Sequence, residues 1–563
     1  MIGKRSSQAD LFDIGNVYDL KLNPRSFHAQ LAHAAPRLFK DEDFAELYHQ
    51  KCGRPSVPPA LLALLVVLQF HAQTSDQETI DRSAYDARWA AVLRRTLGTP
   101  VCAKSTLQLF RAHLFLHEKA NALFLRSLKE AKDAGLLKGA LIALTDTKPM
   151  LGRGAAQDTF NLLGSAVLQL SRALAKEQQT DLNAFLQEEG LTRYQQPSLK
   201  ASADLDWSDE AAKNAFLTTV VAEARALLQK AAGGSQSVKE AAELLSALLL
   251  QDIEEKPSET GPPSASIKDG TTPGRMPSAT DPEVRHGRKS QSHLFKGHKS
   301  AIVTDAASQI VIAVDILAGD APDNTGALAL IHQSEENTGL AVVETEADCA
   351  YGDAKTRHAF VEEGRILHAK VPKSASRNGL FPKSAFTIDL VEGTVTCPSG
   401  EVRTTFTLHP DGSKTYSFGS SCRECPLRAQ CTTAAGGRSV SVAAHEELLQ
   451  KARSYQQTPE GRSNLRKRVG VEHALARLSW LGISQARYRG RAKSRFQLLM
   501  AATVANLRLT WNWQAQNAGN SGEGSSSGLV FGYLPRVCGL LLAFWSALGC
   551  LGLAKCRWEP DLT

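Results

Sequence analysis

The chain has 563 residues, more than a single ordinary hydrophobic core contains, so two to four folded units are expected. Apolar residues make up 43% of it, a composition that excludes a fibrous or wholly disordered protein. The net charge of +7 is modest, but eleven Lys or Arg and a single acid, Glu472, lie between Gly461 and Arg508. Such a basic stretch is either a solvated surface or the binding surface for a polyanion.

The two ends of the chain carry no clear targeting signal. Residues Met1–Gly15 lack the apolar segment of a secretory signal, and the ten cysteines suggest no disulfide framework, so a cytoplasmic protein is expected. Residues Val537–Ala554 are uncharged and mostly apolar, and eighteen residues is close to the lower limit for a membrane span. A membrane-anchored protein is therefore one alternative; we interpret residues 511–563 as a linker followed by an apolar tail.

Residues 1–137 are predicted to form an all-helical domain. An apolar run from Ala60 to Phe70 indicates one helix, and Ser75 with Glu78 gives the capping-box pattern of a second. A third helix, Leu107–Phe115, is predicted to point three polar side chains outward, namely Gln108, Arg111 and His113. A short helix of this kind can enter a DNA major groove, although an ordinary helical bundle fits the same pattern.

Strands and helices alternate beyond residue 137. A short strand, Ala140–Thr145, leads to Asp146, and residues 159–250 have a helical pattern again. Residues Asp252–Pro282 are rich in Pro, Ser, Thr and Gly, and we interpret them as a disordered linker. Two β-branched runs, 300–304 and 310–316, then predict a hairpin.

The remaining elements complete a recognisable order. A helix over 322–336 and a strand over 340–345 lead to Asp348, a helix that begins near Arg466 carries Glu472, and a last helix spans roughly 494–511. A ribonuclease-H-like fold has the same order of elements: a strand that ends at an Asp, a hairpin, a helix, a second strand that ends at an Asp, and a helix that carries a Glu. The expected fold class is therefore a multidomain α+β/α-β protein, with a ribonuclease-H-like core of mixed sheet and flanking helices over residues 138–510.

Three acids in this order point to metal chemistry: Asp146, Asp348 and Glu472. Side chains that follow neighbouring strands converge, and a later helix can add a third carboxylate beside them. Cleavage of a phosphodiester requires charge neutralisation on the attacking and leaving oxygens, which two divalent ions roughly 3.5–4 Å apart provide. Magnesium prefers carboxylate oxygens. Singly, each acid is more often a turn or cap residue, so the prediction rests on their joint order.

Six groups of short motifs follow one another along the chain: Gly53–Pro59; Thr145–Thr147 with Gly152–Phe160; Arg288-Lys289 with Gly297–Lys299; Ala347–Gly352; Arg468–Glu472; and Gly482 with Ala486–Gly490. Together they resemble bacterial insertion-sequence transposases of the DDE type, in the branch numbered eleven eighty-two. The resemblance extends from about Ser26 to Leu509, most of the chain.

The resemblance implies a DNA transposase that cuts at transposon ends and joins the freed 3′-hydroxyl to target DNA. It implies that two Mg²⁺ ions, replaceable by Mn²⁺, are held by Asp146, Asp348 and Glu472. The residues expected to contact DNA are Arg468, Arg477, Arg487, Arg489, Arg491 and Lys299. Double-stranded DNA is the expected partner, bound by a homodimer or larger synaptic assembly, and no small-molecule substrate is expected.

The sequence departs from the related motifs at three positions. The related signature has Tyr three residues before Arg468 and Lys seven after Glu472, where this chain has Leu465 and Ser479; Arg477 is a candidate replacement for the Lys. Cys349 stands where Gly or Arg is more usual. The hairpin also follows Asp146 only after a long interval, which we interpret as a helical insertion and linker over 159–283. A stand-alone metal nuclease and a catalytically inactive DNA-binding descendant are the alternatives.

A second insertion, residues 387–440, contains four cysteines with the spacing C-x24-C-x2-C-x5-C, namely Cys397, Cys422, Cys425 and Cys431. A C-x-x-C pair on a turn can place two thiolates on one tetrahedral Zn²⁺ at about 2.3 Å, and two further thiolates complete a structural site. We predict a zinc-bound insertion here; four reduced thiols in a small β-rich segment are the alternative.

Overall fold

The computed structural model describes residues 1–4, 22–49, 53–117, 119–257, 263–270, 272–290, 292–372 and 379–520, the side chains of 518–520 excepted. Contacts within the chain group it into two units, Met1–Trp513 and Gln514–Thr563. The predicted apolar segment Val537–Ala554 lies outside the described residues. Among the helices that are described, none combines the length and the apolar character that a membrane crossing requires.

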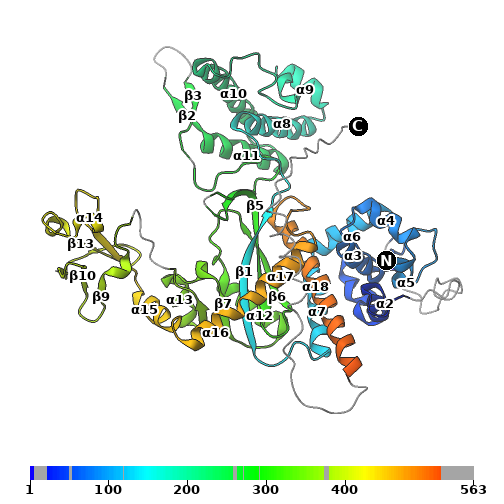
Figure 1. Ribbon diagram of the computed structural model, residues 1–563. Coiled ribbons are helices and arrows are strands. Elements are labelled where there is room, and N and C mark those ends of the chain that lie inside the picture. Colours follow the sequence, from blue (N-terminus) through cyan, green and yellow to red (C-terminus); the bar gives the residue numbers. More distant parts are fainter. Residues whose placement is uncertain are drawn as a thin grey trace, which may run out of the picture. The chain divides into compact units, whose positions relative to one another are not determined.

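The described residues before the first strand form helices and loops (Figure 1). The predicted apolar helix is α3, in which twelve residues are buried and no side of the helix faces solvent. Ser75 caps α4 as predicted, because its Oγ accepts a hydrogen bond from Glu78 N at 3.1 Å. The bounds of these elements are α2 Phe27–Leu38, η1 Asp41–Leu47, α3 Pro59–Ala72, α4 Asp76–Tyr85, α5 Ala87–Leu93, α6 Lys104–Leu116 and α7 Ala120–Asp133.

The third predicted helix is α6, but the prediction that Arg111 points outward is wrong. Its side chain is only 10% exposed, and the guanidinium donates to the Asp76 carboxylate at 2.6 Å and to Gln69 at 2.8 Å. Arg111 lies one turn after Leu107, which is also buried, so the helix period places both on the inner face. The pattern alone could not show the partly buried Asp76 carboxylate that makes an inward Arg stable.

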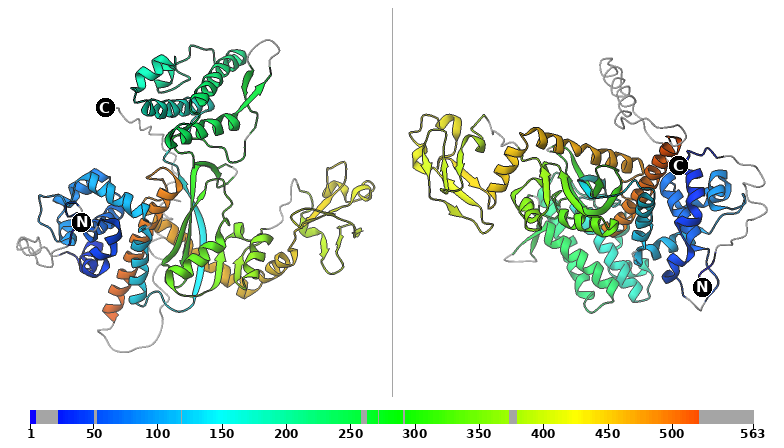
Figure 2. Two further views of the ribbon diagram at one scale, coloured as in Figure 1. Left: turned by 180° about the vertical axis from the view of Figure 1, so that it is seen from behind. Right: turned by 90° about the horizontal axis from the view of Figure 1, so that it is seen from below.

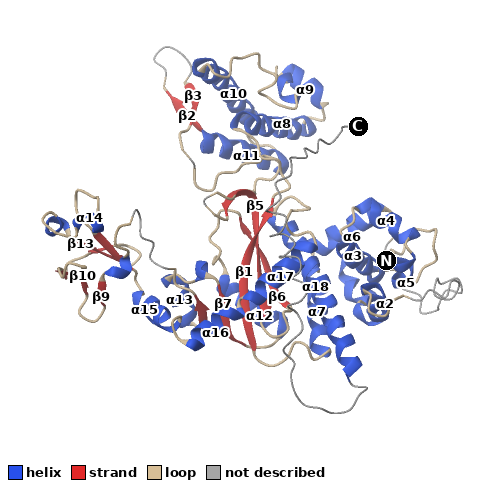
Figure 3. Cartoon of the chain, viewed as in Figure 1, coloured by secondary structure: helices blue, strands red, loops and turns tan. Residues whose placement is uncertain are grey.

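The main sheet contains six strands and is mixed (Figure 3). Strand β5 pairs antiparallel with β1, β4 and β6, whereas β7 pairs parallel with β1, and β8 pairs parallel with β7. The predicted hairpin is confirmed as β5 and β6, and the strand predicted before Asp348 is β7. The bounds are β1 Leu141–Leu151, β4 Arg285–Arg288, β5 Leu294–Asp305, β6 Val311–Ala318, β7 Val342–Ala347 and β8 Ile366–Ala369.

Strand β1 does not end before Asp146, contrary to the prediction. Its pairing with β5 continues from Ala143 to Leu151, whereas its pairing with β7 stops at Leu144. Hydrogen bonds to one neighbour are sufficient to keep the strand extended. Asp146 therefore lies within β1, just past the point where β1 loses its parallel neighbour.

Helices pack on this sheet and share one hydrophobic core with the N-terminal helices. Helix α17 contacts β1 and β5, α16 contacts β7 and β8, and α12 contacts β5, β6 and β7. Helix α12 begins later than predicted, because a turn precedes it and Gly326 adopts φ of 70° at its start. The helix predicted near Arg466 is divided into α16 and α17, with Arg468 between them. The bounds are α12 Ala327–Thr338, η3 Cys349–Tyr351, α13 Ala354–Glu362, α15 Glu446–Tyr455, α16 Pro459–Lys467, α17 Val469–Trp480 and α18 Arg491–Asn520.

The segment after β1 has a hydrophobic core of its own, built from residues 160–279. Both views of Figure 2 show its helices, coloured teal to green, grouped together. The bounds are α8 Thr159–Glu177, α9 Leu182–Glu188, η2 Thr192–Gln195, α10 Glu210–Lys230, α11 Gln236–Asp252, β2 Ile253–Lys256 and β3 Ser264–Ile267.

The prediction that Asp252–Pro282 is a disordered linker is wrong for the described residues of that range. Strands β2 and β3 pair with each other, and Arg275 donates to both carboxylate oxygens of buried Asp252 at 3.0 Å. The backbone N–H of Met276 also donates to Gln251 Oε1 at 2.7 Å. Composition alone predicted disorder, because the residue types of a segment do not show which polar groups will pair with it in the folded chain.

The cysteine-bearing segment consists of short strands and turns around a small core. Its bounds are η4 Lys383–Ala385, β9 Thr387–Asp389, β10 Thr394–Thr396, β11 Val402–Arg403, β12 Thr407–Leu408, β13 Lys414–Ser417, η5 Gly419–Cys422, α14 Arg428–Cys431 and β14 Ser439–Val442. The strands form two small antiparallel sheets, β11-β10-β9 and β12-β13-β14.

Candidate active site

The three acids predicted to act together line one pocket of about 440 Å³. Two of them come from neighbouring parallel strands: β1 and β7 pair with Leu144 opposite Glu346. When this register is continued by two residues, Asp146 stands opposite Asp348. The strand register thus brings together two acids that are about two hundred residues apart in the sequence.

Asp348 follows β7 directly and is oriented by the turn that it begins. It caps the short helix η3, and its Oδ1 accepts a hydrogen bond from Ala350 N at 2.8 Å. This capping bond fixes the rotamer of the carboxylate at the end of the strand.

Glu472 reaches the pocket from α17, which lies close to β1. A Cβ atom on Gly470 would be 2.7 Å from Cδ1 of Leu144, so glycine at this position allows the close approach of helix and strand. The Glu472 side chain is 52% exposed, whereas that of Asp146 is 16% exposed. A helix that carries this carboxylate into the pocket can therefore present it to a ligand from solvent.

Arg468 connects two of the acids. Its Nη2 is 2.8 Å from Glu472 Oε1, one helical turn later, and its Nη1 is 3.7 Å from Asp146 Oδ2. The predicted proximity of Arg468 to the acids is present in the structure. A cation here offsets the repulsion between carboxylates that face the same pocket.

A fourth carboxylate, Asp323, lines the pocket and was missed in the sequence. It lies in the turn between β6 and α12 that was predicted to be helical. Lys299 binds it with Nζ 2.7 Å from Oδ1, and the same Nζ donates to Ala321 O at 2.6 Å. The Pro-Asp-Asn sequence of this turn is the signal that could have marked Asp323 as a turn residue.

Lys148 is a further basic residue of the pocket that sequence reasoning missed. It follows Asp146 by two residues in β1, and its Nζ donates to Ser479 Oγ on α17. Burial, and then the charge of Lys289, lowers the pKa of Lys148. Ser479 is the position at which the related signature has Lys, so in this chain β1 supplies a cation next to that position.

Burial dominates the electrostatics of Asp146 and raises its pKa to about 6. The Thr147 N–H, which donates to Oδ1 at 2.7 Å, and the Arg468 cation oppose this rise, whereas the Asp348 and Asp323 carboxylates add to it. A buried acid with acidic neighbours is stabilised by a bound cation, because the cation removes the cost of the unbalanced charge.

The six residues predicted to contact DNA lie in three kinds of surroundings. Three of them are bonded to the protein itself: Lys299 to Asp323, Arg477 to Gln309 at 2.9 Å, and Arg487 to Thr74 O at 2.6 Å. The two arginines that lie on the surface are Arg489 and Arg491, the latter 3.3 Å from Glu283. Arg468 lies between the acids, as described above.

The four predicted zinc ligands line one pocket together with Arg438 and Phe418. Cys422 and Cys431 are buried, and Cys422 Sγ accepts a hydrogen bond from Arg438 N at 3.4 Å. Burial raises the pKa of the Cys431 thiol; Arg438 opposes this rise, and the three other thiols add to it. Folding therefore collects all four cysteines in one place.

The tightest cluster of metal-ligating side chains was not predicted at all. Within the described residues, one ligand atom each of Glu344, Glu346 and His368 lie within 4.8 Å of one another. Among the described residues, neither the three acids of the pocket nor the four thiols bring their ligand atoms as close together as this. The sequence pattern does not mark these residues as ligands, because polar residues at such positions are common in half-buried strands.

Two family models match the chain. One, described as a transposase DDE domain, matches residues 396–511, which include the four cysteines, Arg468 and Glu472. The other, described as a transposase domain, matches residues 16–113, which include helices α2 to α5 and most of α6. No curated protein and no solved structure matches the chain.

The two matches lie on either side of β1, which carries Asp146, and of β7, which Asp348 follows, and both are described as transposase domains. They agree with the resemblance drawn from the motifs; the narrower branch, numbered eleven eighty-two, stays a prediction. The two family matches therefore support an enzyme that acts as a DDE transposase.

Proposed function

We propose that this transposase hydrolyses phosphodiester bonds at the ends of a DNA element and transfers the freed 3′-hydroxyl to target DNA, with two Mg²⁺ ions held by Asp146, Asp348 and Glu472. The observation that carries the proposal is the shared pocket of these acids, which come from two parallel strands and a helix. The same pocket is lined by cations suited to phosphate: Lys148, Arg288 and Lys289.

A ribonuclease-H-like core is part of the proposal, and the strand order supports it. The strands run β6-β5-β1-β7-β8 across the sheet, with β5 antiparallel to its neighbours and β7 and β8 parallel to β1. An antiparallel hairpin followed by parallel strands joined through helices is the order that the motif analysis predicted. The segment 159–283 is then an insertion between the first strand and the hairpin.

The residues of the pocket fit a pair of hard divalent cations. Two bound Mg²⁺ ions would neutralise charge on the attacking and leaving oxygens of an in-line displacement. Carboxylate oxygens are the ligands that such ions prefer, and the pocket offers them from separate elements. Arg468 bridges Glu472 and Asp146 and would release one of them to a cation or contact a phosphate itself.

Binding of double-stranded DNA, and assembly of two or more copies on it, also belong to this proposal. Residues 1–137 would bind the element's ends, and the cations around the pocket would hold the phosphates beside the acids. Both transposase matches support a DNA partner, because the reaction acts on DNA ends. A Zn²⁺ ion held by the four cysteines would stabilise the segment between Asp348 and Glu472.

The test is cleavage and strand transfer on DNA that carries the ends of the flanking element, with Mg²⁺ and with EDTA. We expect metal-dependent joining by the wild type, a loss of at least a hundredfold in Asp348→Ala, and no change in the control Asp411→Ala, which alters an exposed turn. Metal-dependent nicking without joining would favour a stand-alone nuclease. DNA binding with no cleavage, the same in Asp348→Ala, would contradict the catalytic proposal and favour an inactive DNA-binding descendant.

A further inference from the structure

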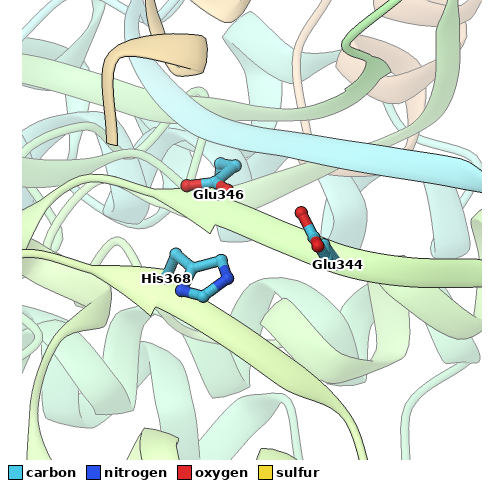
Figure 4. A group of neighbouring side chains, drawn as sticks. All are labelled: Glu344, Glu346 and His368. Atoms are coloured by element: carbon cyan, nitrogen blue, oxygen red, sulfur yellow. The ribbon is translucent and has the colours of Figure 1, made fainter. Parts of the chain in front are cut away.

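Two carboxylates and an imidazole face one another on the strands β7 and β8, outside the pocket of the catalytic acids (Figure 4). Glu344 and Glu346 are two residues apart on β7, so their side chains lie on the same face of the sheet. His368 on β8 is directly opposite Glu346 in the parallel register. One ligand atom from each of the three side chains lies within 4.8 Å of the others.

Glu346 is the unusual member of this cluster, because it is fully buried and unpartnered. Its exposed fraction is 0%, and neither of its carboxylate oxygens has a hydrogen-bond partner in the described part of the chain. A buried carboxyl group without partners is costly, and native proteins rarely keep one without a compensating group. A cation bound between Glu346 and its neighbours would remove this cost.

The Lys467 charge opposes the rise in the pKa of Glu346 that burial causes, but the lysine bonds directly to Glu344 instead. Lys467 of α16 places its Nζ 3.4 Å from Glu344 Oε2, at the outer edge of the cluster, where both side chains are about one third exposed. No ion pair or hydrogen bond joins Lys467 to Glu346 among the described residues. The inner carboxylate and the imidazole remain available to a ligand.

The imidazole is held in a defined plane. His368 stacks on Tyr455, with 4.9 Å between the ring centroids, and the Tyr455 hydroxyl accepts a hydrogen bond from Asn464 Nδ2 at 2.8 Å. Tyr455 is the last residue of α15, and Asn464 lies in α16, which contacts both β7 and β8. Fixing the ring in this way lowers the entropy that a ligand must remove, as the outer neighbours of metal-binding histidines do.

We propose that Glu344, Glu346 and His368 form a binding site for a divalent transition-metal ion, with Zn²⁺ as the best match. Two carboxylates balance the charge of the ion, and one nitrogen with two oxygens is a ligand set that zinc accepts, whereas Mg²⁺ prefers oxygen alone. Zinc ligands lie at about 2.0–2.2 Å from the ion, so the three groups need only small side-chain rotations to share it. The ion would join β7 to β8 two residues before Asp348. The site does not depend on the proposed function, because none of its ligands belongs to the catalytic pocket.

The test compares the zinc content of the full chain with that of His368→Asn. Each protein is saturated with ZnCl₂, dialysed, and measured by elemental analysis, so that zinc at the cysteines or the catalytic acids cancels in the difference. The matched control is His358→Asn, which removes a partly exposed imidazole of α13 that lies 3.0 Å from Glu362 and stacks on His445. We expect His368→Asn to hold one equivalent fewer than the wild type and the control to hold the same number. Equal zinc content in folded His368→Asn and wild type would overturn the proposal.

A second variant keeps the test decisive if His368→Asn folds poorly. Glu346→Leu replaces the buried carboxylate by an apolar side chain of similar volume, and we expect it to fold and to be at least as stable as the wild type without metal. Added Zn²⁺ should raise the melting temperature of the wild type and of His358→Asn more than that of Glu346→Leu. An equal rise in all three proteins would mean that Glu346 is an ordinary buried carboxyl group and not a ligand.

Discussion

Asp146 lies in an environment that differs from that of an ordinary acid, and this makes a prediction about stability. Burial raises its pKa to about 6 from an ordinary 3.8, so the folded state favours the protonated form. Ionisation therefore costs folding free energy as the pH rises through about 6. We expect Asp146→Asn to be more stable than the wild type in EDTA at pH 8, by about 2–3 kcal/mol, and by about half as much at pH 5, because the cost of ionisation grows between the unfolded and the folded pKa.

Urea unfolding at the two pH values measures this difference. Addition of Mg²⁺ should then stabilise the wild type and leave Asp146→Asn unchanged, because a bound cation acts only on the folded protein that can hold it. A gain in Asp146→Asn that is the same at pH 5 and pH 8 would show that packing, and not the buried charge, causes it.

Lys148 and Ser479 make a second prediction at the scale of single residues. The related signature has Lys at the position of Ser479, and here Lys148 of β1 donates to the Ser479 hydroxyl, so the cation reaches the same place from the opposite side. We expect Lys148→Ser to lower strand transfer at least tenfold, because a phosphate near the acids loses its counter-charge. The double variant Lys148→Ser/Ser479→Lys should regain most of the activity.

The exchange of Lys148 and Ser479 is informative because it distinguishes the effect of the positive charge on strand transfer from the effect of the strand or helix that carries it. The rate of strand transfer by the double variant should approach that of the wild type. The rate for Ser479→Lys alone should stay below that of the wild type, because this variant places two cations side by side. If Lys148→Ser retains full strand transfer, the lysine serves only to join β1 to α17.

At the scale of elements, the cysteine-bearing segment is too small to be held by its apolar core alone. Eight buried residues form that core in the described part, and two of them are Cys422 and Cys431. Small units of this kind need a disulfide or a metal, and the thiols are free. We expect Cys425→Ser to lose one equivalent of Zn²⁺ and to show faster amide exchange over residues 386–442, with little change in the main sheet.

Cys349→Ser is the control, since Cys349 is an exposed thiol outside this segment. It should keep the zinc content and the exchange pattern of the wild type. Unchanged zinc content in Cys425→Ser would favour the alternative, four reduced thiols in a small β-rich segment.

The elements could be predicted from local patterns, whereas their pairing could not. β-Branched runs predicted β5, β6 and β7, and the Ser75 cap predicted the start of α4, because neighbouring residues determine both features. The continuation of β1 past Asp146 depends on β5, which is distant in the sequence. The inward position of Arg111 depends on Asp76 in the same way.

For the molecule as a whole, the acids of the pocket could be named from the sequence, but most of their surroundings could not. The motifs named Asp146, Asp348 and Glu472, and these residues share a pocket. Asp323, Lys148 and the cluster around Glu346 arise from turn geometry and strand register, which leave no periodic signal in the chain. The basic stretch was predicted as one surface, yet folding divides its arginines between protein contacts and solvent.

That division makes a prediction about DNA binding by the whole molecule, tested on two arginines two residues apart. Arg489 is exposed, whereas Arg487 donates to Thr74 O at 2.6 Å and lies over the Phe70 ring. Each phosphate contact contributes about −0.9 to the slope of log K against log salt. We expect Arg489→Gln to reduce the steepness of that slope by about 0.9, with an unchanged melting temperature. Arg487→Gln should keep the slope and lower the melting temperature, because it loses a partly buried hydrogen bond. Fluorescence anisotropy across a salt series, with thermal unfolding of the same samples, measures both quantities. If both variants reduce the slope equally, Arg487 leaves its protein partners when DNA binds, and the loop that carries both residues rearranges on the DNA.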